Sequence, residues 1–239
     1  MIAAIDDDTD LVCVALVSNV NGHIESMRRI SDAAHAHGAL VYADVIQAAG
    51  IVPFDVVDLG IDFAACNGYK WLYGPHGCGF LYVREDLQGG VLPDYRYPGS
   101  SNPNYLEDPD ADEPDFPFHA PSSASRYQPG HVSYLGYSAV YEGIKFLNRV
   151  GVENFLAHSL RLVARIRDRI DSAKYELVSP YTDRSPIITF RSPDARHLNP
   201  ALREARADLS VSSNRVRISP AIYNNEEDVD RLLEILNAG

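Results

Sequence analysis

Asp44 and Lys70 are two residues capable of acid–base or covalent chemistry, and each follows a stretch that is typical of a buried β-strand. Ligands of open parallel sheets bind at the carboxyl ends of the strands, so side chains at these positions would reach a common site. Gln47, three residues after Asp44, could join them. Taken singly, Asp44 could cap a turn and Lys70 could be a surface lysine.

A lysine and an aspartate together suit one cofactor chemistry. A lysine amine forms a Schiff base with pyridoxal phosphate, and an aspartate keeps the pyridinium nitrogen of that cofactor protonated. The sequence holds only three lysines, Lys70, Lys145 and Lys174, so a lysine that follows a strand stands out. The pair therefore favours a pyridoxal-phosphate site over a turn cap and a surface lysine.

The elements that would position these residues indicate an α/β fold in the first half of the chain. The apolar run Leu11 to Ser18 is typical of a strand buried on both faces of a parallel sheet. Apolar residues at helical spacing from Ile24 to Ala34 predict a helix that stops near Gly38, and Ala39 to Asp44 predicts the next strand. Two further short strands are predicted at 62–66 and 78–83. This order indicates a mostly parallel sheet with right-handed crossovers.

The second half of the chain predicts a small α+β domain. Residues 87–128 are rich in proline, glycine and, from Glu107 to Asp115, acids, which indicates a long irregular loop. Helices are predicted at 133–149 and 152–173 with a break at Gly151, followed by strands at 176–178, 187–191, 209–211 and 215–218 and a closing helix at 226–236. We therefore expect a cofactor-binding domain over residues 1–149 and a small domain over residues 150–239.

Composition excludes several classes of protein. The net charge of −12 repels nucleic-acid backbones and anionic membranes. No apolar stretch approaches the roughly 20 residues of a membrane span, and acids occupy the N-terminus, so we expect a cytoplasmic protein. The cysteines, Cys13, Cys66 and Cys78, are odd in number and lie in apolar or glycine-rich contexts, which predicts reduced, buried thiols. No metal site is expected.

Four motifs occur in an order that resembles the class V aminotransferase family. The first motif is Ser18-Asn19-Val-Asn-Gly22. The second has two parts, Val41-Tyr-Ala-Asp44-Val-Ile-Gln47 and Asn67-Gly-Tyr69-Lys70-Trp-Leu-Tyr-Gly74. The third motif is Arg126-Tyr-Gln-Pro-Gly-His131, and the fourth begins with Arg217-Ile-Ser-Pro. The resemblance implies a fold-type I enzyme that depends on pyridoxal phosphate, as the lysine and aspartate already suggested.

The resemblance also implies a role for each matching residue. Lys70 would form the internal aldimine and move the α-proton, Asp44 would pair with the pyridinium nitrogen, and Gln47 would bond the phenolic oxygen. Arg217 would bind the substrate carboxylate through both guanidinium nitrogens, although a salt bridge from Arg217 to Glu226 or Asp228 is the alternative. Further contacts to cofactor or substrate are implied for Asn19, Asn67, Tyr69 and, across a homodimer, His131.

Three departures from the family pattern qualify the expected function. Family members ordinarily carry a longer N-terminal portion with a phosphate-binding turn, and His131 stands where threonine is usual. No cysteine follows Cys78, whereas a desulfurase needs a mobile C-terminal cysteine to accept sulfur. We therefore expect transamination or related α-carbon chemistry on a small amino acid. A C–S or C–Se lyase is the first alternative, and a truncated, non-catalytic relative is the second.

Overall fold

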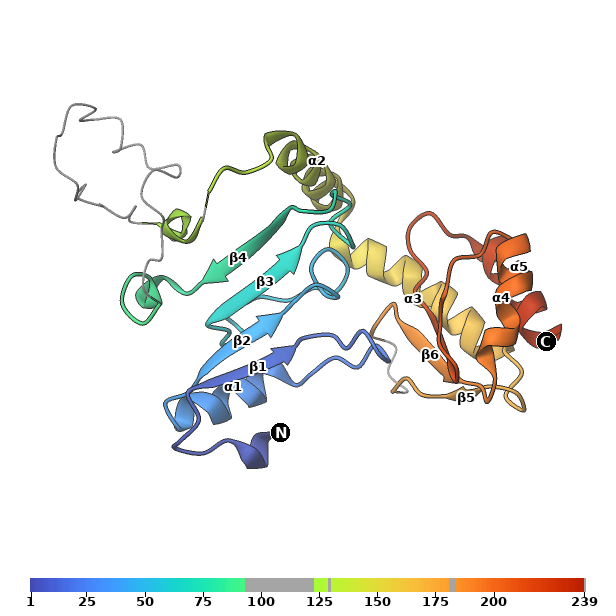
Figure 1. Cartoon of the computed structure of the whole chain (residues 1–239), viewed down its shortest axis with the longest axis horizontal. Helices are drawn as coiled ribbons and strands as arrows, with labels where there is room; N and C mark the ends of the chain where they lie inside the picture. The colour runs from blue at the N-terminus through green and yellow to red at the C-terminus, as the bar shows by residue number, and fades with distance from the viewer. Residues whose placement is uncertain (93–122, 129, 181–183, 239) are drawn as a thin grey trace.

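Two four-stranded sheets organise the chain. The structure, a computed structural model, describes residues 1–92, 123–128, 130–180 and 184–238. The first sheet comes from the N-terminal half and the second from the C-terminal half, and the long helix α3 runs from one toward the other (Figure 1). Each sheet has its own cluster of buried apolar side chains. None of the described helices is long and apolar enough to cross a membrane.

The first sheet has the strand order β1-β2-β3-β4. Strands β1, β2 and β3 are parallel, and β4 is antiparallel to β3. Helix α1 connects β1 to β2, so the predicted strand-helix-strand unit and mostly parallel α/β sheet are confirmed. The bounds are β1 Leu11–Ala15, α1 Met27–Ala36, β2 Leu40–Asp44, β3 Phe63–Asn67 and β4 Gly79–Val83, with 3-10 helices at Ile2–Ala4 and Glu85–Leu87.

Helix α1 packs through the apolar spacing that predicts it. Met27, Ile30 and Ala34 are buried and belong to the same cluster as Val41 of β2, because residues three and four apart share one face of a helix. The helix ends before Gly38, whose φ of +78° lies in the left-handed region that glycine adopts at little steric cost. The predicted stop at Gly38 is confirmed.

Strand β1 is covered on one face only, and the prediction of burial on both faces is wrong. Val12 is buried, whereas Leu11, Cys13 and Ala15 are exposed. Successive side chains of a strand point to opposite faces, and the described residues cover only the face to which Val12 belongs. The expectation of a buried Cys13 fails for this reason. Cys66 and Cys78 are buried, and all three thiols are free.

Helices α2 (Tyr134–Val150) and α3 (Val152–Arg169) meet at Gly151, as the sequence predicts. Gly151 has a φ of +92°, which interrupts the helical backbone. Helix α3 contributes Phe155 to the first cluster of buried side chains and Ile166 to the second. Since α3 packs in both clusters, the division of the chain into domains at residue 149 stays a prediction.

The second sheet has the strand order β5-β6-β8-β7, with antiparallel pairs throughout. Helices α3 and α5 supply buried residues to its cluster. The bounds are β5 Glu176–Leu177, β6 Ile188–Arg191, α4 Asn199–Glu204, β7 Ser210–Val211, β8 Arg215–Ile218 and α5 Glu226–Ala238, with 3-10 helices at Ala124–Tyr127 and Ala195–Leu198. Of these helices the sequence predicted only α5. Most of the predicted loop, including the acidic run 107–115, lies outside the described residues.

A fully buried carboxylate ties the first sheet to its covering helix. Asp62 Oδ2 accepts hydrogen bonds from Val41 N at 2.7 Å and from His35 Nε2 of α1 at 2.8 Å. Asp62 Oδ1 accepts a hydrogen bond from Arg84, the residue after β4. Asp62 is 0% exposed, so these partners replace the water that a carboxylate otherwise requires.

We expect Asp62→Asn to lower the free energy of unfolding by about 2 to 3 kcal/mol, because hydrogen bonds to a buried charged group are lost or weakened. Urea denaturation at pH 7 measures the change. Asp86→Asn is the matched control, since Asp86 is the exposed carboxylate on the same Arg84, and it should leave the midpoint nearly unchanged. Equal effects of the two substitutions would contradict a structural role for the buried carboxylate.

Candidate active site

Asp44 stands at the centre of the edge formed by the carboxyl ends of the parallel strands. It is the last residue of β2, and the register pairs it with Ala15 of β1 and Ala65 of β3. Its side chain is exposed, and Oδ1 accepts a hydrogen bond from Ile46 N at 2.9 Å. The turn-capping alternative therefore holds for one oxygen. Oδ2 makes no hydrogen bond to a described residue and faces a ligand or water.

The turn that carries Lys70 is held tightly between β3 and helix α2. Gly74 N donates a hydrogen bond to Gly68 O at 2.8 Å, which closes the turn. A Cβ on Gly74 would lie 2.4 Å from Val140 Cγ2 of α2, and a Cβ on Gly68 would lie 2.9 Å from it. Because no side chain fits at either position, glycine is required for the turn to pack on α2.

The surroundings of Lys70 favour its neutral amine. Burial lowers the pKa of Lys70, and the charge of Arg217 lowers it further, while Asp44 and Cys66 act in the opposite direction. Interactions of this kind require proximity, so the structure brings Lys70, Asp44 and Arg217 into one site. An amine with a depressed pKa is a better nucleophile at neutral pH than an ordinary lysine.

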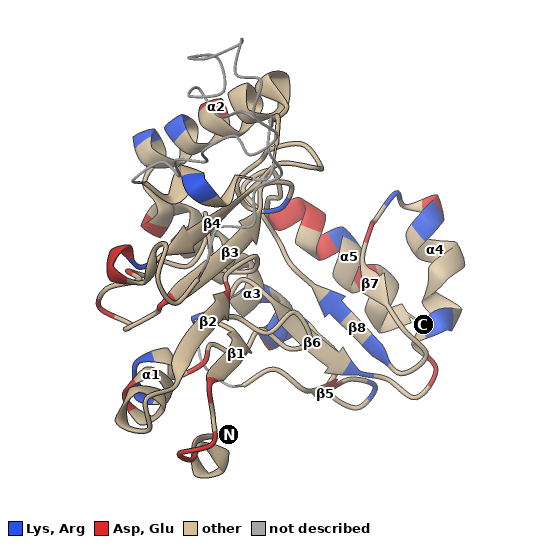
Figure 2. Cartoon of the chain, turned by 60° about the vertical axis from the view of Figure 1, so that its left-hand side comes forward, with Lys and Arg blue, Asp and Glu red and all other residues tan. Residues whose placement is uncertain are grey.

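Arg217 reaches this site from β8, a strand that carries two arginines, Arg215 and Arg217 (Figure 2). Its Nη1 donates to the backbone oxygen of Asn19 at 2.6 Å, and its Nη2 donates to Ser210 Oγ at 2.6 Å. Its Nε is buried and has no hydrogen-bond partner among the described residues. Burial and the charge of Arg215 lower the pKa of Arg217. The guanidinium is thus oriented by neutral oxygens and keeps an uncompensated charge that suits a carboxylate.

The alternative ion pair of Arg217 does not form. Glu226 Oε2 instead forms an ion pair with Arg165 Nη1 at 3.1 Å, and Asp228 Oδ2 accepts a hydrogen bond from Asn225 N at 3.2 Å. Both carboxylates are therefore used near the start of α5, and Arg217 forms no ion pair with a described residue.

The loop after β1 joins the candidate site to the second sheet. Thr189 Oγ1 donates to Val20 O at 2.8 Å, and Ser179 Oγ donates to Asn21 O at 2.7 Å. With the bond to Asn19 O, three consecutive carbonyls of this loop accept hydrogen bonds from side chains of the second half of the chain. The side chain of Asn19 itself is exposed, so its predicted contact with a cofactor or substrate stays a prediction.

Gln47 is buried and positioned by Trp71. Its Oε1 accepts a hydrogen bond from Trp71 Nε1 at 3.2 Å, and its Nε2 makes no hydrogen bond to a described residue. Trp71 and Ser210 are site residues that were not expected from the sequence. Trp71 is the single tryptophan and directly follows Lys70, which is a signal that the sequence offers. Ser210 is signalled only by the sheet, where it pairs with Arg217 in the β7–β8 ladder.

The remaining predicted site residues are Asn67, Tyr69 and His131. Asn67 ends β3 with an exposed side chain, and the Tyr69 ring stacks on His76 with centroids 4.3 Å apart and lies 6.0 Å from Lys70 Nζ. His131 is exposed and lines a cavity of about 680 Å³ whose lining does not include Lys70. The structure gives no contact between His131 and the other site residues, and the roles of all three stay predictions.

A family model described as aminotransferase class-V matches residues 1–232. A probable cysteine desulfurase of Methanothermobacter thermautotrophicus is 28% identical over 98% of this chain and 61% of its own length. A cysteine desulfurase of Haloferax volcanii is 28% identical over 98% of this chain and 57% of its own length. The uncharacterized aminotransferase YcbU of Bacillus subtilis is 24% identical over 98% and 60%. The chain thus spans about 60% of the length of these relatives.

Solved structures share the fold. An apo cysteine desulfurase from Thermococcus onnurineus NA1 matches with a TM-score of 0.83 and 22% identity, over 98% of this chain and 64% of that one. C-DES, described as a cystine C–S lyase in complex with its product cysteine persulfide, matches with a TM-score of 0.83 and 20% identity, over 99% and 63%. A C-DES mutant with glycine covalently linked to its PLP cofactor matches with a TM-score of 0.85 and 19% identity, over 99% and 62%.

We expect Arg217→Gln to raise the pKa of Lys70, because the substitution removes a nearby positive charge that disfavours the ammonium form. Reductive methylation with formaldehyde requires the neutral amine, so modification of Lys70 should shift to higher pH in the variant. Peptide mass spectrometry over a pH series measures the shift for each lysine. Lys145 and Lys174 are internal controls and should not shift. An unchanged Lys70 profile would contradict the assigned proximity of the two charges.

Proposed function

The chain belongs to the class V aminotransferase family of pyridoxal-phosphate enzymes, and from this premise we propose that it carries the lysine and the carboxylate-binding arginine of an enzyme that cleaves a C–S bond in a small amino acid. The observation that carries the proposal is the hydrogen bond from Arg217 to Asn19 O, which holds the guanidinium at the loop after β1, near enough for its charge to lower the pKa of Lys70. Arg217 suits the carboxylate of an amino acid, and the lowered pKa of Lys70 favours the neutral amine that a nucleophile or base needs.

C–S cleavage is favoured over transamination by the relatives. Two of the three curated relatives above are named cysteine desulfurases, and the C-DES structure is named a cystine C–S lyase. Of the two activities expected from the sequence, α-carbon chemistry such as transamination and, as an alternative, a C–S or C–Se lyase, the names of these relatives support the lyase.

The cysteines of this chain favour release of sulfur to solution rather than transfer to an enzyme thiol. Burial and the charge of Asp44 raise the pKa of Cys66 to about 11, which keeps it a thiol at neutral pH. Cys78 is 1% exposed, and Cys13 lies in the middle of β1, opposite Tyr42, away from the strand ends. None of the three is a suitable sulfur acceptor beside Lys70.

The polar groups of the site fit pyridoxal phosphate. Lys70 would hold the cofactor covalently through Nζ, the free Asp44 Oδ2 suits a protonated pyridine nitrogen, and the unpaired Nε2 of Gln47 suits a phenolic oxygen. When bound, pyridoxal phosphate supplies an electron sink that makes the α-hydrogen of an amino acid acidic. Burial of Gln47 and its bond to Trp71 would keep the amide oriented.

The chain's own residues then have defined tasks. Arg217 binds the substrate carboxylate and so fixes the amino acid at one end, with its guanidinium oriented by Asn19 O and Ser210 Oγ. Once the substrate amine has displaced it from the cofactor, the freed Lys70 Nζ would accept the α-proton. The Cβ–S bond breaks with its electron pair on sulfur, and the Lys70 ammonium returns a proton to the departing thiolate. Asp44 Oδ2 would hold the ring nitrogen of the cofactor.

Reconstitution with pyridoxal phosphate tests the proposal. Borohydride reduction followed by peptide mapping should place the label on Lys70, and the reconstituted protein should convert cystine to pyruvate, ammonia and cysteine persulfide. Lys70→Ala should abolish both. A label on Lys145 or Lys174, or no label at all, would overturn the assignment, and the second outcome would favour the non-catalytic alternative.

A cysteine-free variant separates a lyase from a desulfurase. Replacing Cys13 with serine and both Cys66 and Cys78 with alanine should leave C–S cleavage intact, because no thiol of this chain takes part. Activity lost in this variant while labelling of Lys70 persists would point instead to an enzyme-bound persulfide.

Arg217→Lys should weaken substrate binding by more than tenfold while cofactor binding stays nearly unchanged. Lysine keeps the charge but removes the planar fork, and the loss of such a charge-assisted pair costs about 2 to 5 kcal/mol. Spectral titration with amino acid and a melting temperature measure the two effects. A variant that melts lower but binds substrate normally would show that Arg217 has only a structural role.

We also propose that the chain pairs with a second copy of itself through α2. Tyr134, Leu135 and Tyr141 of this helix are 78%, 85% and 61% exposed, which is unusual for large apolar side chains on one helix. A two-fold pairing here would cover them, and His131, just before α2, would then lie near the partner.

A cytoplasmic location stays a prediction from the sequence.

A further inference from the structure

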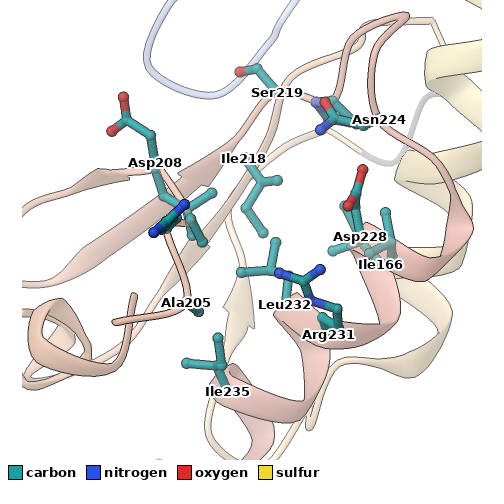
Figure 3. A pocket seen from close by; sticks show the side chains of 15 residues that line it. Ile166, Ala205, Asp208, Ile218, Ser219, Asn224, Asp228, Arg231, Leu232 and Ile235 are labelled. Carbon is teal, nitrogen blue, oxygen red and sulfur yellow. The ribbon is translucent and has the colours of Figure 1, made fainter. Parts of the chain in front are cut away.

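A pocket of about 220 Å³ lies in the second half of the chain, between β8, α5 and the segment that leads from α4 to β7 (Figure 3). Ile218 lines it from β8, and the neighbouring Arg217 belongs to the opposite face of that strand because side chains alternate. The pocket is therefore separate from the candidate active site. Its apolar floor is formed by Ile166, Ile218, Leu232 and Ile235.

Two arginines line this pocket without an acidic partner. Arg206 and Arg231 make no side-chain hydrogen bond or ion pair to a described residue, although Asp208 and Asp228 line the same pocket. In Figure 3 the carboxylates of Asp208 and Asp228 stand on opposite sides and point away from the apolar side chains, while the Arg231 guanidinium lies beside Leu232. Asp228 already accepts the hydrogen bond from Asn225 N. Both arginines are exposed, and their guanidiniums are free to bind a ligand at the mouth of the pocket.

The backbone holds Arg206 in a conformation that arginine disfavours. Its φ is +55°, at the position after α4 where glycine is the usual residue. Arg206 N donates to Arg203 O and Ala207 N donates to Leu202 O, which completes the helix-ending motif without any need for a guanidinium. The Arg206 side chain thus does not stabilise the turn in which its backbone is strained. The described structure leaves it one role, as part of the lining of the pocket.

We propose that this pocket binds a small aliphatic carboxylate. The guanidiniums of Arg206 and Arg231 hold the carboxylate, since the planar fork matches two carboxylate oxygens, and the aliphatic tail covers the floor of isoleucine and leucine. The volume of about 220 Å³ limits the ligand to the size of a short branched acid. The inference needs neither a cofactor nor activity at Lys70, so it is independent of the proposed function.

Calorimetric titration of the full chain with 4-methylpentanoate, in a buffer free of phosphate, tests the proposal. We expect saturable binding and a raised melting temperature. Arg231→Gln should weaken binding about tenfold or more, as expected for the loss of a charge-assisted pair. The isosteric 4-methylpentan-1-ol, which lacks the charge, should bind at least tenfold more weakly. Arg203→Gln is the matched control, because Arg203 is exposed like Arg206 and Arg231 but does not line the pocket.

Arg206→Gly separates ligand binding from a structural role. Glycine relieves the left-handed strain, so the variant should melt at a higher temperature than the natural chain while its affinity for 4-methylpentanoate falls about tenfold or more. The absence of saturable binding, or binding that both arginine variants retain, would overturn the proposal. Inorganic phosphate that binds equally well with the same dependence on arginine would overturn the assignment to a carboxylate and leave a general oxyanion site.

Discussion

The site depends on the contact between the loop after β1 and the second sheet. Arg217 donates to Asn19 O, and the next two carbonyls of the loop accept hydrogen bonds from Thr189 and Ser179. A Cβ on Gly22 would lie 2.4 Å from Ile187 O, so the approach is close enough to require glycine. Because of this contact, an arginine far along the chain lies beside the lysine at the edge of the first sheet. Without this contact, Asp44 and Lys70 would remain with the first sheet and Arg217 with the second.

Charge has an unusual distribution in this chain. The net charge is −12, yet Arg217 is oriented by a carbonyl and a hydroxyl rather than by a carboxylate, and its charge lowers the pKa of Lys70. A substrate carboxylate bound to Arg217 would neutralise that charge and so raise the pKa of Lys70. Under the proposed function, binding of the amino acid at Arg217 would therefore also change the protonation of Lys70.

The environments of the thiols bear on the chemistry as much as the names of the relatives do. Several relatives are named cysteine desulfurases, while Cys66 of this chain is held as a thiol by its raised pKa and by a hydrogen bond from Sγ to Asn67 O. Cys78 packs against Gly136, where a Cβ would lie 2.4 Å from its sulfur. Both thiols therefore serve packing around the lysine turn.

The sequence by itself determined the order of the strands and of the helices other than α4 and the 3-10 helices, the stops at Gly38 and Gly151, and the positions of Asp44 and Lys70 at and after strand ends, because these follow from local spacing and backbone preference. It also supplied the family, through motifs that keep their residue types. Tertiary structure alone decided that β1 is covered on one face, that Trp71 orients Gln47, and that Ser210 and Asn19 O hold Arg217. These features depend on contacts between segments that are far apart in the chain, and local residue spacing does not determine such contacts.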